Sequence, residues 1–575
     1  MLITYYLLLI TFMSNQASAK QIRRTLRETF GFEKLRPGQR EVIENVLAGK
    51  DTLAIMPTGA GKSLCYQLPA LHLEGMTIVV SPLISLMKDQ TDKLEEKGLD
   101  VANLNSSVSE SEQRESLEQV EREASDFVFT TPERLTDAKF LETIKDKQID
   151  FVVIDEAHCI SQWGHDFRPA FLEIRVALKQ LKNPPILALT ATATSEVIED
   201  IKRQLERPQM QVVNSGIFRP NLVFEVVHTT NDLEKRENLA KFLRETQGSK
   251  IVYCATVKAV EEVFDFLEKV EIAAEKYHGK LSAKQRHETQ DHFMSGEIET
   301  IVATNAFGMG VDKADIRAVV HWQIPGSLES YYQEAGRAGR DGSPSRCVLL
   351  YDTRDRRVQQ FFLGGRYPKA DDILAIYQTL ENFSTAANLT QIQETIGDAV
   401  AKTKTRVALN LLKDAKVVRE KRGAKFELSK RDLNDAEIEK IAAEYIEKGE
   451  TDREKLERMM LYAQSAFCRW RILSEYFEAE SEEIEKCGSC DNCERPVEER
   501  LEIKTPEIQV KPEEEEILRK LKENAASKIV VGEIVNLPQN LEGEVKSIED
   551  DKVTVVLPNG ETKMFKMEFV LPQNQ

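Results

Sequence analysis

The feature that most constrains the fold is a glycine-rich loop, Pro57-Thr58-Gly59-Ala60-Gly61-Lys62-Ser63. The apolar run before it, residues 52–56, predicts a buried strand, and the run after it, residues 64–68, predicts a helix. A turn between a strand and a helix points backbone N–H groups at anionic oxygens, and the helix dipole favours negative charge there. We therefore expect a phosphate-binding loop. Met56 stands where the first Gly of G-x-x-x-x-G-K-[ST] would be, so a chance glycine-rich turn remains the alternative.

Each residue of the loop suits one task in binding a nucleotide. Gly59 and Gly61 allow the tight turn and the close approach of the backbone to phosphate oxygens. Lys62 would reach the outer phosphates, and the Ser63 hydroxyl would hold Mg²⁺. Thr58 lies inside the same loop and is counted with the nucleotide-binding residues.

Strands and helices alternate after this loop, with strands expected at residues 77–80, 126–131 and 151–154. This rhythm predicts a parallel sheet with helices on both faces. The last of these strands ends in Asp155-Glu156, and the carboxyl ends of parallel strands form the crevice in which such sheets bind ligands. We expect Asp155 to hold Mg²⁺ and Glu156 to orient and deprotonate an attacking water.

Three residues upstream of the loop suit a purine. Phe32 could stack on adenine, and Gln39 could pair with its amino edge, in the bidentate geometry that glutamine uses with adenine in DNA. Arg36 lies between them and is included in the same predicted site. An ordinary helix cap and staple would also explain this stretch, and that alternative stays open.

The segment directly after the acidic pair is rich in aromatic and polar residues. Trp163 and Phe167 are unusual for a core in this context, and exposed aromatics beside a catalytic strand suit stacking on single-stranded nucleic acid. Arg168 is grouped with them as a nucleic-acid contact. A Trp that packs the loop onto its own lobe is an equal alternative.

A second alternating pattern begins at about residue 218 and predicts a second lobe. Residues 305–312 predict an open, glycine-containing loop that suits a moving contact between lobes or with a nucleic-acid backbone. Farther on, we expect Gln333, Arg337 and Arg340 to share one face of a helix, because they are spaced by four and three residues. Guanidinium groups aimed at the first lobe would supply an arginine finger to the γ-phosphate when the lobes close. A salt-bridged surface helix is the alternative.

The region after the second lobe has helix-like segments and a basic hairpin. Helices are expected at residues 372–380, 390–396 and 402–413, followed by a hairpin-like run at 417–428. Three helices and a hairpin suggest a winged helix, and the local basic patch suits phosphate contacts with duplex DNA. A plain helical bundle with a charged edge is as good an explanation. The predicted DNA contacts are Arg419, Lys421 and Arg422.

Four of the eight cysteines are clustered in the pattern C-x18-C-x2-C-x2-C, and four thiolates at this spacing suit tetrahedral Zn²⁺. Disulfides are the rival reading and would be unusual in a cytosolic enzyme. All four ligand positions are filled, so the expected site is structural. The predicted ligands are Cys468, Cys487, Cys490 and Cys493.

The composition, 41% hydrophobic and 30% charged residues, is that of a soluble globular protein, and 575 residues predict three to five domains. The net charge of −18 argues only weakly against nucleic acid, because binding depends on where basic residues lie. Residues 2–13 are apolar and precede Ala17-Ser18-Ala19, which resembles a signal-peptidase site. No Lys or Arg precedes this run, so our hypothesis is that translation starts at Met13. The expected location is cytoplasmic and nucleoid-associated.

Several of these motifs together resemble one family. The Gly-Lys-Ser loop, Asp-Glu-Ala-His at 155–158, the aromatic-rich loop and Thr-Ala-Thr at 190–192 resemble a superfamily-2 helicase of the RecQ type. The most specific elements are Phe-Gly-Phe at 30–32 with Leu-Arg-Pro-Gly-Gln at 35–39, and Ser-Gln-Trp-Gly-His-Asp-Phe-Arg-Pro at 161–169. The resemblance spans residues 20–351, and the cysteine cluster resembles the zinc module of the same family.

The resemblance implies an ATP-driven 3′-to-5′ DNA helicase of repair and recombination, with ATP and Mg²⁺ between two RecA-like lobes. Within it, Arg340 matches the arginine finger and Arg337 the accompanying sensor. The alternatives are an RNA helicase, a translocase that does not unwind, a non-catalytic nucleotide-switched DNA-binding protein, and a zinc-dependent binding module with a decayed motor. The expected partners are single-stranded DNA and duplex junctions, with a possible protein partner at the C-terminus and no membrane.

These expectations divide the chain into an α/β motor and smaller C-terminal parts. Residues 371–429 depart from the commonest RecQ layout, in which zinc-binding helices follow the motor directly. The last part has short strands broken by turns and resembles a small SH3-like or KOW-like barrel. The predicted parts are a leader or misassigned start (1–19), an ATP-binding lobe (20–215), a second lobe (216–365), a winged-helix-like module (366–435), a zinc module (436–497), an acidic linker (498–525) and the barrel (526–575).

Overall fold

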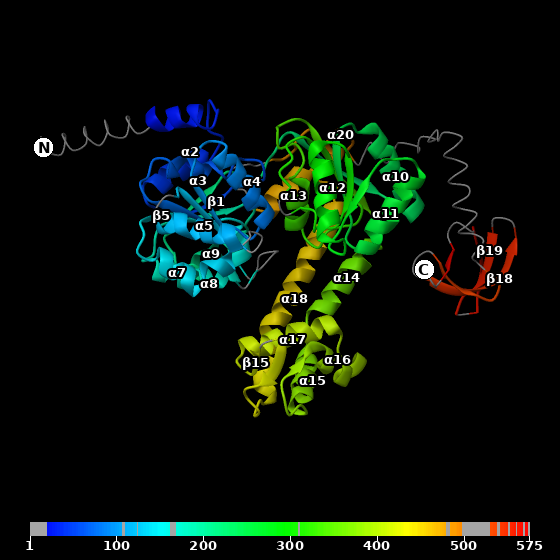
Figure 1. The fold of residues 1–575 in the computed structure, drawn as a ribbon. Helices are drawn as coiled ribbons and strands as arrows, with labels where there is room; N and C mark the ends of the chain where they lie inside the picture. The colour runs from blue at the N-terminus through cyan, green and yellow to red at the C-terminus, as the bar shows by residue number, and fades with distance from the viewer. Residues whose placement is uncertain are drawn as a thin grey trace, which may run out of the picture. The chain divides into compact units, whose positions relative to one another are not determined.

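The structure is a computed structural model (Figure 1), and its described part covers most of the motor. The predicted leader, the predicted acidic linker, Trp163, Phe167 and Arg422 lie outside the described residues. The chain divides into two compact units, Met1–Val497 and Glu498–Gln575, and each is taken by itself below. The described residues are 20–105, 110–122, 125–161, 168, 170–308, 311–421, 423–478, 484–496, 530–537, 541–549, 552–558, 560–566 and 570–572.

Residues 20–215, which we call lobe 1, are built on a seven-stranded parallel sheet in the order β3-β4-β2-β5-β6-β1-β7. The parallel sheet predicted from the sequence is thereby confirmed. Its strands are β1 (Thr52–Ile55), β2 (Met76–Val80), β3 (Val101–Leu104), β4 (Phe127–Thr130), β5 (Ile149–Ile154), β6 (Ile186–Thr190) and β7 (Gln211–Asn214). Its helices are residues 20–28, α2 (Gln39–Leu47), α3 (Leu64–Ala70), α4 (Ile84–Glu95), α5 (Glu110–Glu121), α6 (Pro132–Leu135), α7 (Ala138–Ile144), the 3₁₀ helix η1 (Ala157–Ile160), α8 (Ala170–Gln180) and α9 (Ser195–Gln204).

Both faces of this sheet are covered, as the apolar strands require. Successive residues of a strand point to opposite faces, so Leu53 and Ile55 join one buried cluster while Ala54 and Met56 join another. Strand β1 pairs with β6 and β7, and β5 pairs with β6. The loop after β1 and the acidic pair after β5 therefore share the carboxyl edge of the sheet, with the end of β6 between them.

Residues 216–365, which we call lobe 2, are built on a second parallel sheet of six strands in the order β10-β11-β9-β12-β13-β8. This confirms the second lobe. Its strands are β8 (Leu222–His228), β9 (Ser249–Tyr253), β10 (Glu275–Tyr277), β11 (Thr300–Ala303), β12 (Ile316–His321) and β13 (Ser345–Tyr351). Its helices are α10 (Asp232–Glu245), α11 (Val257–Lys269), α12 (Ala283–Ser295), α13 (Leu328–Ala335) and α14 (Asp355–Arg366).

The next region contains the three predicted helices and the predicted hairpin. A three-stranded antiparallel sheet, β14-β16-β15, packs with these helices around a core that includes Ile376, Leu412 and Phe426. The elements are α15 (Ala370–Glu381), β14 (Ala387–Asn388), α16 (Leu389–Ile396), η2 (Gly397–Ala399), α17 (Lys402–Asp414), β15 (Val418–Lys421) and β16 (Lys425–Leu428).

Helix α18 (Asp435–Gln464) is the longest described helix, with 30 residues, and it belongs to two cores. Near its start, Ile438 and Ala442 pack into the core of the preceding region, whereas Met459 and Tyr462 near its end pack into the core of lobe 2. Figure 1 shows it beside α14, which it contacts. Among the described residues, neither α18 nor any other helix combines the length and the apolar composition that crossing a membrane requires.

The second unit is a small antiparallel sheet in the order β20-β19-β18-β17-β21 around buried residues such as Val535 and Val555. Strands β19 and β20, consecutive along the chain, pair antiparallel. In the described part of this unit the sheet is open, with β20 and β21 at its edges, so closure into a barrel is not shown. The strands are β17 (Ile534–Leu537), β18 (Leu541–Glu549), β19 (Lys552–Val556), β20 (Thr562–Lys566) and β21 (Leu571–Pro572).

Candidate functional site

The glycine-rich loop lies where the sequence predicts it, between the fully buried strand β1 and helix α3. Gly59 and Gly61 have φ angles of 84° and 81°, in the left-handed region that favours glycine. A Cβ atom added to Gly61 would lie 2.6 Å from Gln39 Nε2. The loop can therefore take this path only because both positions are glycine.

Two residues of the predicted purine site, Arg36 and Gln39, bond to the phosphate loop. The Gln39 side chain is buried, and its Nε2 donates to the carbonyls of Ala60 (3.1 Å) and Gly61 (2.9 Å) while its Oε1 accepts from Arg36 N (2.8 Å). Arg36 Nη1 donates to the carbonyl of Gly59. The adenine contact of Gln39 stays a prediction, and the side chain of Phe32, which is 51% exposed, is available for stacking.

Lys62 and the acidic residue at the end of β5 belong to one electrostatic group. Lys62 Nζ donates to the Met56 carbonyl at 3.2 Å, and burial lowers its pKa, an effect that Glu156 and Asp155 oppose. Burial and the neighbouring Glu156 raise the pKa of Asp155 to about 7. A carboxylate in this position is poorly stabilised until a cation binds.

The oxygens present at this point fit Mg²⁺. Ser63 is the N-cap of α3, but its side chain makes no capping bond to the helix, and its Oγ accepts a long contact of 3.4 Å from Gln90 Nε2. The Asp155 carboxylate accepts bonds from Glu156 N (3.0 Å) and Ser81 Oγ (3.4 Å). A hydroxyl and a carboxylate beside a phosphate loop are hard oxygen ligands of the kind that Mg²⁺ prefers.

Glu156 is held in a strained conformation. Its backbone is left-handed (φ 49°, ψ 48°), which is costly for a non-glycine residue and is found mainly at functional sites. Its buried Oε2 accepts no hydrogen bond from the described residues and lies 3.3 Å from His158 Nδ1. His158 Nδ1 also lies 3.1 Å from Thr190 Oγ1, which donates to the Thr192 carbonyl at 3.0 Å. The predicted base is thus linked to the Thr-Ala-Thr segment.

The arginines of lobe 2 do not share a helix. Helix α13 ends at Ala335, so Gln333 is helical, whereas Arg337 and Arg340 lie in the turns that follow. The predicted common helical face is wrong because glycines end the helix: Gly336 is its C-cap, and Gly339 is left-handed, with φ of 54°.

Arg340 nevertheless reaches the phosphate loop of lobe 1. A Cβ atom at Gly59 would lie 3.4 Å from Arg340 Cγ. Arg340 Nη1 donates to Asp312 Oδ1 at 2.6 Å, and Asp312 Oδ2 pairs with Lys93 Nζ of lobe 1 at 3.0 Å. The Arg340 Nε is buried and donates to no partner among the described residues. Sequence reasoning missed Asp312 as the partner of this arginine, although Asp312 closes the glycine-containing loop that it singled out.

Arg337 packs against that same loop. Its side chain is buried, and a Cβ atom at Gly308 would lie 2.8 Å from Arg337 Nη2. Gly336, one residue earlier, lies against Thr58 of lobe 1, where an added Cβ would be 3.5 Å from Thr58 Cβ. The two lobes therefore meet at the phosphate loop.

The predicted nucleic-acid residues are separated in the structure. Arg168 is half-buried, and its Nη1 donates to the Pro82 carbonyl at 3.3 Å, in lobe 1. Arg419 and Lys421 are exposed on β15, where Lys421 pairs with Glu427 at 2.7 Å. They line an open groove of about 710 Å³, whose other lining residues are Lys413, Lys416, Val418, Glu420, Gly423, Ala424 and Ser429.

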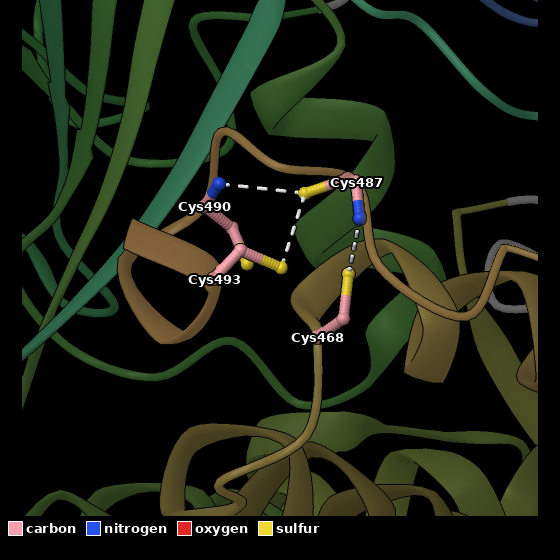
Figure 2. Close-up of side chains that lie close together, drawn as sticks. All are labelled: Cys468, Cys487, Cys490 and Cys493. Carbon is pink, nitrogen blue, oxygen red and sulfur yellow. Dashed lines mark hydrogen bonds between the residues drawn. The ribbon is translucent and has the colours of Figure 1, made fainter. Parts of the chain in front are cut away.

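The four clustered cysteines converge, and their sulfur atoms lie within 4.8 Å of one another (Figure 2). They are free thiols without disulfide bonds, and Cys487 Sγ lies 3.9 Å from Cys493 Sγ. Tetrahedral Zn²⁺ with Zn–S bonds of about 2.3 Å separates its sulfur ligands by about 3.8 Å. Backbone N–H groups of Cys487 and Cys490 point at the sulfurs of Cys468 and Cys487. The geometry and the donors fit a structural zinc ion.

Two residues beside the cysteines fix this cluster to lobe 2, and sequence reasoning missed both roles. The fully buried Arg469 pairs with Asp491 through two bonds of 2.9 Å, and Asp491 Oδ2 also accepts from Val226 N of β8 at 3.0 Å. Trp470 packs edge-on against Phe224, with ring centroids 4.9 Å apart. The sequence feature that could have indicated this attachment is Asp491, a charged residue between two of the clustered cysteines.

Three family models match the sequence. The DEAD/DEAH box helicase model covers residues 36–201, the helicase conserved C-terminal domain covers 234–342, and the RecQ zinc-binding model covers 433–494. The last match includes all four cysteines, so the cluster is a zinc site, and the first two contain the nucleotide pocket.

Similar proteins agree with these matches. The ATP-dependent DNA helicase RecQ of Bacillus subtilis is 48% identical over 345 residues, which are 59% of this chain and 57% of that protein. The probable ATP-dependent DNA helicase RecS of the same organism is 36% identical over 476 residues, which are 82% of this chain and 92% of that protein. Among solved structures, DNA-bound MrfA has 20% identity and a TM-score of 0.48, covering 72% of this chain and 59% of that one. The chain spans little more than half of the RecQ protein but nearly all of RecS, and it belongs to the RecQ family of ATP-dependent DNA helicases.

Proposed function

We propose that this chain is an ATP-dependent 3′-to-5′ DNA helicase that couples ATP hydrolysis between its lobes to movement along single-stranded DNA. The observation that carries the proposal is the position of Arg340, a lobe 2 residue that lies against Gly59 of the phosphate loop in lobe 1. A pocket completed by both lobes ties hydrolysis to their relative motion, which is what a stepping motor requires.

In this proposal each residue of the pocket has one task. Lys62 and the backbone of the glycine-rich loop hold the phosphates, and Ser63 and Asp155 hold Mg²⁺, which neutralises charge on the phosphate oxygens. Glu156 orients the attacking water and accepts its proton. Arg340 leaves Asp312 for the γ-phosphate, since both partners are anionic and the phosphate bears the larger charge.

The region around α17 and β15 is the part of the chain to which this proposal assigns duplex DNA binding. We interpret the three helices and the β14-β16-β15 sheet as a winged helix that grips duplex DNA through the groove lined by Arg419 and Lys421. Removing both charges should weaken DNA binding and lower the slope of log affinity against log salt by about 2, since each phosphate contact contributes about 0.9. The matched control replaces Lys258 and Lys284, two exposed lysines on helices of lobe 2. An unchanged slope in the Arg419, Lys421 double variant would contradict this interpretation.

The C-terminal unit and the cellular setting complete the proposal. A small antiparallel sheet with short strands suits docking of a protein or nucleic acid, and closure into a barrel is part of this proposal. Action on chromosomal DNA would give the protein a cytoplasmic, nucleoid-associated location.

A strand-displacement assay tests the function. Duplexes with a 3′ tail, a 5′ tail or no tail are incubated with the full chain, ATP and Mg²⁺, and unwinding is expected only with the 3′ tail. Glu156→Gln should still bind ATP while losing turnover and unwinding by about 10²-fold or more, because the general base contributes roughly that factor. DNA-stimulated ATP hydrolysis without strand separation would favour a non-unwinding translocase, and displacement of RNA strands alone would favour an RNA helicase.

A further inference from the structure

Arg219 is a buried cation at the start of lobe 2 that binds the main chain of the arginine-bearing loop. Its guanidinium donates to the carbonyls of Gly336 (2.6 Å), Ala338 (2.7 Å) and Gly339 (2.7 Å), and only 9% of the residue is exposed. These three carbonyls belong to the turns that carry Arg337 and Arg340. The Arg219 side chain thus holds both ends and the middle of residues 336–339, the segment that connects α13 to Arg340, the predicted arginine finger.

The burial of Arg219 needs a reason, because a buried charge is costly unless it is compensated. No ion pair between Arg219 and a carboxylate is found among the described residues. The nearby Asp341 is engaged in an ion pair with Arg317. Burial lowers the pKa of Arg219. Hydrogen bonds to three carbonyls at 2.6–2.7 Å are the compensation, and the planar guanidinium is the side chain best shaped to make them simultaneously.

Asn221 completes the support two residues later. Its Nδ2 donates to the carbonyls of Gly339 (2.8 Å) and Ser343 (3.0 Å). A Cβ atom added to the left-handed Gly339 would lie 2.4 Å from this nitrogen, so the contact requires glycine there. The carbonyl of Gly339 therefore accepts bonds from both side chains, and the path of the loop is determined just before Arg340.

The same short segment is attached to lobe 1 at its other end. Ser215 N donates to the carbonyl of Ile55, the last residue of β1, at 3.0 Å. The phosphate loop begins two residues after Ile55. The connection from residue 215 to residue 221 thus runs from the strand that precedes the phosphate loop to the turns that bear the arginines.

We propose that Arg219 is a positioning residue that holds the turn after α13, and so places Arg340 for its action on the nucleotide in lobe 1. The inference rests on the proposed function, since it assigns a support to the arginine that completes the ATP pocket. Its effect on catalysis passes through the turn that holds Arg340, so it concerns the rate of hydrolysis and not the binding of nucleotide.

A double-mutant cycle on the full chain tests the proposal, with DNA-stimulated ATP turnover and nucleotide affinity as separate readouts. Arg219→Ala should lower kcat by about 10²-fold, the cost of a small misplacement of a catalytic group. Nucleotide affinity should stay within a factor of about three. In the Arg340→Ala background, the same substitution should change kcat by less than about threefold, because residues that act through one another are not additive. Arg346→Ala is the matched control, since this lobe 2 arginine bonds Glu225 and not the loop.

The results of this cycle distinguish an error in the role of Arg219 from an error in the proposed function. Equal losses of kcat in both backgrounds, an unchanged kcat, or a loss confined to nucleotide affinity would each overturn the role of Arg219. If Arg219→Ala does not fold, Arg219→Lys and Asn221→Ala enter the same cycle, because each removes part of the support and leaves a polar side chain or a smaller gap. A wild-type protein that hydrolyses no ATP would contradict the proposed function, whereas normal turnover with additive losses contradicts the inference alone.

Discussion

At the residue scale, the phosphate loop depends on contacts that the motif itself does not contain. Gln39 comes from the helix before β1, yet its amide supports the carbonyls of Ala60 and Gly61 and packs where a side chain at Gly61 would be. The glycine is therefore needed for two reasons, its left-handed backbone and the space that Gln39 occupies.

The two reasons can be separated by matched substitutions. Gly61→Ala should reduce nucleotide affinity about 30-fold, because displacing Gln39 breaks two bonds worth about 1 kcal/mol each. Gly98→Ala has nearly the same backbone strain, with φ of 78°, but open space around its Cβ, and should leave affinity unchanged. Titration with a fluorescent nucleotide measures both. Equal affinities for the two variants would contradict the role assigned to Gln39.

A site residue could be predicted from the sequence when the residues next to it in the chain indicate its function. Lys62 and Ser63 follow a buried strand and glycines, and Asp155 ends another strand, so each could be assigned from local pattern alone. Arg219 and Asp312 act on groups about 120 and 28 residues away, and no local pattern reveals such a contact. For Gln39 the sequence predicts an adenine contact, which stays a prediction, but it does not reveal the bonds to the phosphate loop.

At the scale of elements, the zinc module is an extension of lobe 2. Cys468, Trp470 and Cys490 share one buried cluster with strand residues such as Phe224 and with Tyr462 of α18. Because α18 also enters the core formed by α15, α16 and α17, we expect the zinc ion to stabilise more than its own knuckle.

Removing zinc should therefore destabilise the motor. Chelation of the metal from the full chain should lower Tm by about 6–12 °C, the shift expected for a loss of about 3 kcal/mol in a domain of 150–250 residues. Trp470, fully buried in the native protein, should become exposed and shift the emission of tryptophan to longer wavelength. Cys493→Ala should reproduce the effect, whereas Cys254→Ala, at a buried cysteine outside the cluster, should retain zinc. Zinc loss with unchanged Tm and emission would show that the module is independent of lobe 2.

The sequence predicts most of the buried central strands but few of the strands at the edges of the sheets. Strands with three or four consecutive apolar residues, such as β2 and β5, are recognised because both faces of a central parallel strand are buried. Strand β7 (Gln211–Asn214) has a single buried residue and no apolar run, so its pattern carries little information. The shared role of α18 could not be predicted either, since a long helix with mixed polarity does not reveal that its two ends contact different cores.

At the scale of the whole molecule, the central claim is that one ATP pocket is divided between two lobes. The relative position of the phosphate loop and the acidic pair follows only from the strand order of lobe 1. The strands that precede them, β1 and β5, are both neighbours of β6 and not of each other. Lys93 of lobe 1 and Arg340 of lobe 2 meet on the same carboxylate, Asp312. In the proposed function, ATP would offer Arg340 a stronger anion than Asp312, and hydrolysis would remove it.

The most direct measurement is DNA-stimulated ATP hydrolysis by Arg340→Ala, with nucleotide affinity determined on the same protein. The account predicts that kcat falls by about 10³-fold or more, the usual contribution of an arginine finger, while nucleotide affinity changes little. Turnover by Arg340→Ala at the wild-type rate would contradict it.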